Sequence, residues 1–80
     1  MDSKIAVVAI IVTNPEAVSK VNELLHEYRE VIIGRLGIPY REKGVSVISV
    51  VLDAPIEKIN SLSGKLGQTE GVSSKVLTTK

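Results

Sequence analysis

The sequence of 80 residues predicts a single α+β domain over residues 1–80. Its elements follow the order strand, helix, strand, strand, helix, strand. Three observations lead to it. Four short segments rich in β-branched residues are separated by two segments whose apolar residues recur at helical spacing. Each helical segment follows an apolar segment and a proline. The pentapeptide KVNEL at 20–24 also matches KINSL at 58–62, as two related halves of a split strand–helix–strand unit would.

The first half of the chain predicts a strand, a helix and a second strand. Ile5–Val12 is an uninterrupted apolar run, which is typical of a buried strand. The sequence Thr-Asn-Pro-Glu at 13–16 fits a helix-capping box with a proline in the first turn. From Glu16 to Arg29 the apolar side chains fall within an arc of about 120°, which predicts a one-sided helix. Val31–Ile38, which two glycines interrupt, predicts the second strand.

The second half of the chain repeats this pattern. Residues 39–44 form a polar connection with turn residues at both ends, and Val45–Leu52 predicts the third strand. Asp-Ala-Pro at 53–55 again has the composition of a helix start, and the apolar residues at 56, 59, 62 and 66 share one narrow arc. Gly67 and Gly71 end this helix, and Val72–Leu77 predicts the fourth strand.

With right-handed crossovers, this order gives a four-stranded antiparallel sheet with both helices on one face, the ferredoxin-like arrangement. The first and third strands are then the central pair. The helices can cover only one side of the sheet, and a strand with one side in water usually alternates apolar and polar residues. The central strands do not alternate. Ile5–Val12 is apolar on both sides, and only Ser46 and Ser49 are polar within Val45–Leu52.

The uncovered side of the sheet predicts self-association. Left in water, it would expose a larger apolar patch than soluble monomers usually carry. The simplest cover is a second copy of the same chain, related by a two-fold axis. We therefore expect a homodimer or a homotetramer.

Composition narrows the classes of function. The chain has no cysteine, which excludes disulfides, thiolate metal sites and cysteine nucleophiles. Its net charge is +1, so neither nucleic acid nor an anionic membrane is an expected partner. The longest apolar run is far shorter than the about 20 residues of a membrane-spanning helix. It is followed by Thr-Asn-Pro-Glu rather than by a small-residue cleavage site, so we expect a cytoplasmic protein.

The residue patterns of catalysis and cofactor binding are not found in the sequence. No acid–base pair, nucleophile–base pair or metal cluster emerges, and His26 is the single histidine. The segment SGKLG at 63–67 departs from a phosphate-binding P-loop twice, because Ile59 and Leu66 stand where that motif has a glycine and a hydroxyl residue. The central strands carry none of the aromatic residues on which RNA-binding domains stack bases. The sequence therefore predicts neither an enzyme nor a cofactor.

Five residues are candidates for binding an effector or a partner. Arg35 is a charge within an apolar strand, where it either protects an edge strand from aggregation or contacts an anion or a carboxylate at a subunit boundary. Tyr40 and Arg41 lie in the connection between the second and third strands and form either a packed hairpin tip or a recognition site. Gly64 and Gly67 either loosen the end of the second helix or let a partner or ligand approach closely.

Three segments carry a resemblance to a known family: VNELLHEY at 21–28, IGRLGIPYRE at 33–42 and LSGKLGQ at 62–68. They resemble the small ACT-like proteins described as regulators of the iron-only hydrogenase system, which have about this length throughout. The likeness covers nearly the whole chain. It implies a ferredoxin-like fold, self-association and a regulatory role near hydrogenase maturation in anaerobic bacteria.

Two related groups sharpen what this resemblance implies. ACT-type modules commonly bind amino acids at subunit interfaces near the loop after the first strand, which makes Thr13 and Asn14 candidates for effector binding. The effector domains of nickel-responsive repressors place His and Cys ligands on the third strand and at the start of the second helix. Positions 48, 50, 55 and 56 are Ile, Val, Pro and Ile here, so no nickel site is implied. A ribbon–helix–helix segment that contacts DNA is not found either.

Two functions of different classes follow. The leading hypothesis is an oligomeric, ligand-responsive regulatory module that binds a small-molecule effector between protomers and has no DNA-binding element of its own. The alternative is a structural or adaptor protein that docks a partner polypeptide, for instance a regulatory protein, through Tyr40, Arg41 and residues 64–68. A panel of small molecules separates the two, because only the first predicts that one of them raises the melting temperature.

Overall fold

The computed structural model describes residues 2–79 and has the predicted order of elements. The strands and helices are β1 (Lys4–Val12), α1 (Val18–Glu27), β2 (Ile32–Tyr40), β3 (Val45–Ala54), α2 (Ile56–Gly67) and β4 (Val72–Thr78). Single turns of 3₁₀ helix occupy residues 15–17, 29–31 and 41–43. Neither helix within residues 2–79 is long and apolar enough to cross a membrane.

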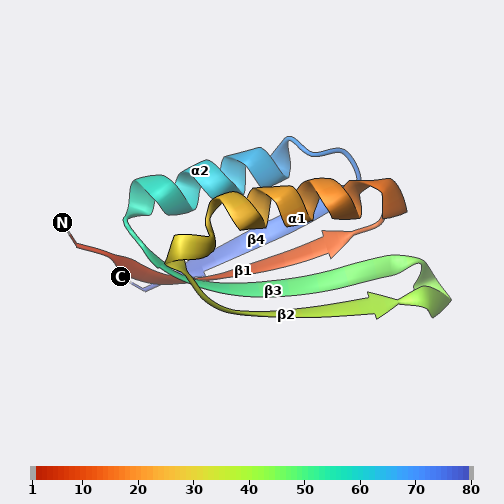
Figure 1. The fold of residues 1–80 in the computed structure, drawn as a ribbon, viewed down its shortest axis with the longest axis horizontal. Helices are drawn as coiled ribbons and strands as arrows, with labels where there is room; N and C mark the ends of the chain where they lie inside the picture. The colour runs from red at the N-terminus through yellow and green to blue at the C-terminus, as the bar shows by residue number, and fades with distance from the viewer. Residues whose placement is uncertain (1, 80) are drawn as a thin grey trace.

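The four strands form one sheet in the order β2-β3-β1-β4, with every neighbouring pair antiparallel. Both helices lie on the same side of this sheet, and the opposite side is left bare (Figure 1). The ferredoxin-like fold predicted from the sequence is therefore confirmed, with β1 and β3 as the central strands. In their register Val8 lies opposite Val50, and Ile10 lies opposite Ile48.

The hydrophobic core fills the space between the helices and the sheet. On β1 the alternate residues Ala6, Val8, Ile10 and Val12 are almost completely buried. The predicted apolar arcs of the helices meet them: Val21, Leu24 and Leu25 from α1, and Ile59, Leu62 and Leu66 from α2. Burying one such aliphatic side chain is worth about 1.5–3 kcal/mol, so this layer supplies most of the stability of the domain.

The start of α1 differs from the predicted capping box. Asn14, and not Thr13, is the cap: its Oδ1 accepts a hydrogen bond from the Glu16 backbone N–H at 3.0 Å, and Pro15 begins a 3₁₀ turn that leads into the helix. The Thr13 hydroxyl instead donates to the Gly71 carbonyl at 3.3 Å. An asparagine followed directly by proline satisfies the first free N–H groups without the reciprocal glutamate bond.

The predicted bounds of two other elements also change. Asp53 and Ala54 continue β3, and Pro55 precedes α2 without any side-chain cap, so Asp53 does not start the helix. Pro39 and Tyr40, predicted as part of a polar connection, are the last residues of β2. Pro39 is tolerated there because β2 is an edge strand, whose outer backbone groups need no partner within the sheet.

The edge strand β2 is the least covered part of the fold. None of its residues is buried, and only Ile32 is half-buried. Figure 1 shows α1 and α2 above the remaining strands, with β2 at the margin of the sheet. The structure therefore offers two uncovered regions, the bare side of the sheet and the margin between β2 and α1.

Candidate functional site

The bare side of the sheet, called the open face below, carries exposed apolar residues on all four strands. The register places eight exposed apolar residues there: Ile5, Val7 and Ile11 of β1, Leu36, Ile38 and Tyr40 of β2, Val47 of β3 and Leu77 of β4. Their exposed fractions run from 38% for Val7 and Val47 to 74% for Leu77. The strand pattern read from the sequence is thus confirmed, since each central strand has apolar side chains on both sides.

The size of the open face is that of a protein interface. The exposed fractions of the eight residues correspond to on the order of 800 Å² of surface, close to what each partner contributes to a standard protein–protein interface. The largest apolar patch of a typical monomer is about 300–600 Å². Only two charged strand residues point to this side, Asp53 near one end of β3 and Lys75 on β4, and they have opposite signs.

The two residues suggested by the ACT resemblance use their side chains within the fold. Thr13 bonds to the Gly71 carbonyl, and Asn14 caps the turn before α1. Gly71 is held against this pair, with φ at +80° and its missing Cβ position 2.5 Å from the Cβ of Asn14. From the sequence, Gly71 was expected to end α2 and open β4. Its close approach to Asn14 was not predicted, because the two residues lie far apart in the sequence.

Tyr40 and Arg41 lie at the same end of the sheet as the start of α1. With Val12, Pro15 and Val18 they line a hollow of about 180 Å³. Tyr40 is 44% exposed and belongs to the open face, whereas Arg41 begins the 3₁₀ turn that joins β2 to β3. This end of the molecule therefore combines an exposed aromatic ring with a guanidinium group.

Arg35 lies on the helix side of β2, opposite Val50, and not on the open face. Its Nη2 donates a hydrogen bond to Oδ1 of Asn22 on α1 at 3.0 Å. Arg35 does not line the hollow of Tyr40 and Arg41, but it lines an adjacent hollow that shares Val18, Pro39 and Ser46 with it. The contact of Arg35 with Asn22 was not predicted from the sequence, because it depends on how α1 lies over the sheet.

Gly64 and Gly67 lie on the exposed side of α2. Neither has a positive φ, and a Cβ at either position would meet nothing within 4 Å. Glycine in the interior of a helix costs about 1 kcal/mol relative to alanine. No contact within residues 2–79 accounts for these two glycines.

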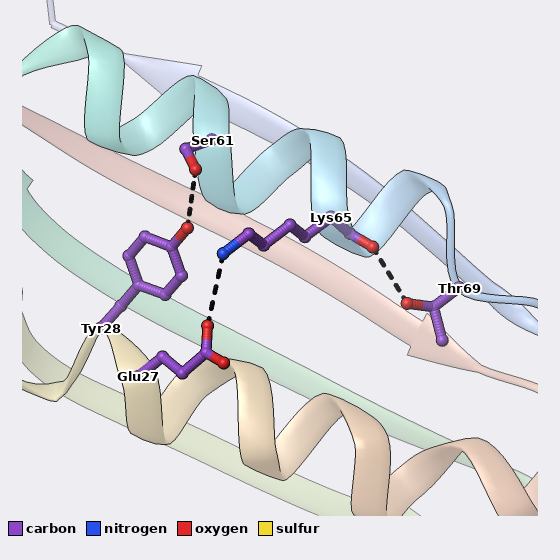
Figure 2. A network of polar contacts seen from close by, with 5 residues as sticks. All are labelled: Glu27, Tyr28, Ser61, Lys65 and Thr69. Carbon is purple, nitrogen blue, oxygen red and sulfur yellow. Dashed lines mark hydrogen bonds and ion pairs between the residues drawn. The ribbon is translucent and has the colours of Figure 1, made fainter.

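A polar network joins the two helices on their outer side, as Figure 2 shows. The Tyr28 hydroxyl lies 2.8 Å from Oγ of Ser61, and Nζ of Lys65 lies 3.4 Å from the Glu27 carboxylate and 5.4 Å from the centre of the Tyr28 ring. Tyr28 and Glu27 together raise the pKa of the Lys65 ammonium above its ordinary value. The network lies beside a hollow of about 420 Å³, and it connects α1 to α2 rather than holding a reactive group.

The described residues 2–79 include no group of three His, Asp or Glu side chains close enough to hold a metal ion. His26 is exposed on α1.

Comparison with known proteins places these features in a family. Residues 4–76 match the family model described as "TM1266-like: Iron-only hydrogenase system regulator, putative". A solved structure titled as that of the uncharacterized protein TM1266 from Thermotoga maritima is 39% identical, with a TM-score of 0.93, and the match covers 99% of this chain and 100% of that chain. No curated protein matches the chain.

A more distant solved structure shares the fold alone. It is a formyltetrahydrofolate deformylase from Pseudomonas putida KT2440, with 14% identity and a TM-score of 0.65. The match covers 90% of this chain and 28% of that enzyme. The description of the matching family is that of a regulator, not of an enzyme.

Proposed function

Because the chain belongs to the TM1266-like family of iron-only hydrogenase system regulators, we propose that it is an oligomeric regulatory module that responds to a small-molecule effector. Its output would pass through self-association or a partner protein. The resemblance stated from the sequence is confirmed at the level of the family. The oligomeric and ligand-responsive mechanism is the proposal.

The open face is the observation that carries this proposal, and its occupant is a second copy of the chain. The exposed surface of this face is on the order of the 800 Å² that one partner contributes to a stable pair. Two further features favour a copy over a different protein. Asp53 and Lys75 give the face one charge of each sign, so two copies do not repel each other. A two-fold axis in the plane of contact lets one apolar surface cover another of the same shape.

The effector hypothesis is tested by the melting temperature of the full chain in the presence of amino acids, organic acids, nucleotides and metal ions. A ligand at 100 times its Kd stabilises the native state by about 2.7 kcal/mol, which raises the melting temperature of a domain of this size by about 10–20 °C. We expect at least one of these classes of ligand to raise the melting temperature. If none shifts the transition at millimolar concentration, the sensing function is wrong.

An adaptor role is the second candidate, and the exposed glycines of α2 favour it. Gly64 and Gly67 leave the backbone of α2 open to close approach, since a Cβ at either position would meet nothing within 4 Å. In that case a Gly64→Leu variant keeps its fold but loses its partner, and no small molecule changes the melting temperature. A ligand-dependent shift that Gly64→Leu leaves intact contradicts the adaptor role.

A further inference from the structure

A hollow of about 270 Å³ lies at the margin between α1 and β2. Its lining consists of Asn22, Leu25, His26, Arg29, Ile32 and Arg35. The floor is apolar, because Leu25 is buried and Ile32 is half-buried. The other four side chains are polar or cationic, and no carboxylate is among them. Small-molecule sites typically have this composition, an apolar floor with a few converging polar groups.

The two guanidinium groups in this lining have unused hydrogen-bonding capacity. Arg29 donates through Nη1 to the His26 carbonyl at 3.0 Å, and Arg35 donates through Nη2 to Oδ1 of Asn22 at 3.0 Å. Each group has five N–H donors, so most of them remain free. Within residues 2–79 neither arginine has a carboxylate partner, since the ion pair there joins Lys65 to Glu27.

The existing bonds of Arg29 and Arg35 orient them without neutralising them. The Arg29 bond places its guanidinium against the end of α1, and the Arg35 bond spans from the edge strand to the same helix. Both acceptors are neutral oxygens, so the positive charge of each group stays available to a ligand. Planar guanidinium groups bind carboxylates and phosphates through paired N–H donors, which favours an oxyanion over a halide.

We propose that this hollow binds a small molecule through a carboxylate or phosphate group held by Arg29 and Arg35, with Asn22 and His26 as further hydrogen-bonding groups. Its volume suits a molecule of the size of an amino acid or a short dicarboxylic acid. Glu23 lines the neighbouring hollow beside Asn22 and His26, so its carboxylate repels an anion on that side. The anion therefore enters from the side of β2.

This inference rests on the proposed function, because it names the chemical class of the small-molecule effector that the proposed regulatory module would bind. The lining comes entirely from one protomer and lies on the helix side of β2, away from the open face. Anion binding and self-association can therefore fail separately.

The test is an NMR titration of the ¹⁵N-labelled full chain with succinate and, separately, with inorganic phosphate, at constant ionic strength. We expect saturable shifts centred on residues 22–35 for at least one of the two, and the arm that saturates identifies the anion class. Arg29→Gln and Arg35→Gln remove a charge-assisted contact each, so each weakens binding about tenfold. Lys58→Gln is the control, because it removes one positive charge from the exposed side of α2, outside the hollow, and should leave the affinity unchanged.

Several results would overturn the proposal. They are shifts that do not saturate with either probe, an equal loss of affinity in Lys58→Gln, and binding of an acidic peptide when neither probe binds. Repeating the titration on a Val7→Lys variant, which alters only the open face, separates the two proposals. We expect Val7→Lys to bind the anion as a monomer. In the unmodified chain, saturable binding by a monomer contradicts the oligomer alone, and an oligomer that binds neither anion contradicts this site alone.

Discussion

The two sides of β1 are nearly identical in chemistry and opposite in environment. Ala6, Val8, Ile10 and Val12 point to the helices and have exposed fractions of 1% or less. Their neighbours Ile5, Val7 and Ile11 are just as apolar and are 38–45% exposed. One side is covered by the helices of the chain itself. The other side has no cover within residues 2–79, and its apolar character is the reason why we propose that a second copy covers it.

The largest expected effect comes from placing a charge on the covered side. Val8→Lys buries an ammonium group among aliphatic side chains with no partner, which costs about 3–5 kcal/mol. This is a large part of the stability of a small domain, so we expect the variant to be largely unfolded. Circular dichroism and denaturant titration measure the loss. A folded Val8→Lys with wild-type stability would contradict the position of β1 in the core.

The same substitution one residue earlier tests the open face. Val7→Lys places the ammonium group where a second copy is expected, so we expect dissociation into folded monomers rather than unfolding. Sedimentation gives the mass, and circular dichroism reports the retained fold. Ser19→Lys adds the same charge to the exposed side of α1 and should leave the assembly intact. If both variants dissociate, net charge and not the open face controls association.

Gly71 and Gly64 show the same contrast between a covered and an uncovered position, with smaller expected effects. Gly71→Ala forces a Cβ into Asn14 at a positive φ, which should lower the free energy of unfolding by about 1–3 kcal/mol. Chemical denaturation measures the change. Unaltered stability would show that Asn14 moves aside at no cost, and the close approach would then have no structural role.

Gly64 is the matched opposite of Gly71, because its added Cβ meets nothing. Gly64→Ala should raise the free energy of unfolding by about 1 kcal/mol through helix propensity alone. The same denaturation experiment gives the sign. A decrease would reveal that the surface of α2 is covered by another molecule.

The smallest effect is expected at Lys65, whose contacts with Tyr28 and Glu27 are exposed. Because its pKa is raised in the folded state, the stabilisation is present below the ordinary value of 10.5 and is lost as the pH rises through the raised pKa. Lys65→Gln should therefore lower the melting temperature slightly at neutral pH and have no effect at strongly alkaline pH. An equal difference in melting temperature between the variant and the unmodified chain at both pH values would contradict an electrostatic contribution.

The sequence predicted the fold because its signals are local. Apolar runs, helical spacing and prolines identify every strand and helix, and the apolar character of Ile5–Val12 on both sides identifies the open face. What the sequence did not predict depends on contacts between distant segments. The packing of Gly71 on Asn14 and the bond of Arg35 to Asn22 each join elements that only the folded chain brings together. For the same reason Arg29 was not recognised as a neighbour of Arg35.

The hydrodynamic mass of the unmodified chain in dilute solution tests the central claim most directly. Sedimentation velocity at micromolar concentration should give a particle of at least twice the 8.6 kDa of one chain. A single species of 8.6 kDa would mean that water alone covers Ile5, Val7 and Ile11, and the assignment of the open face to a second copy would then be wrong.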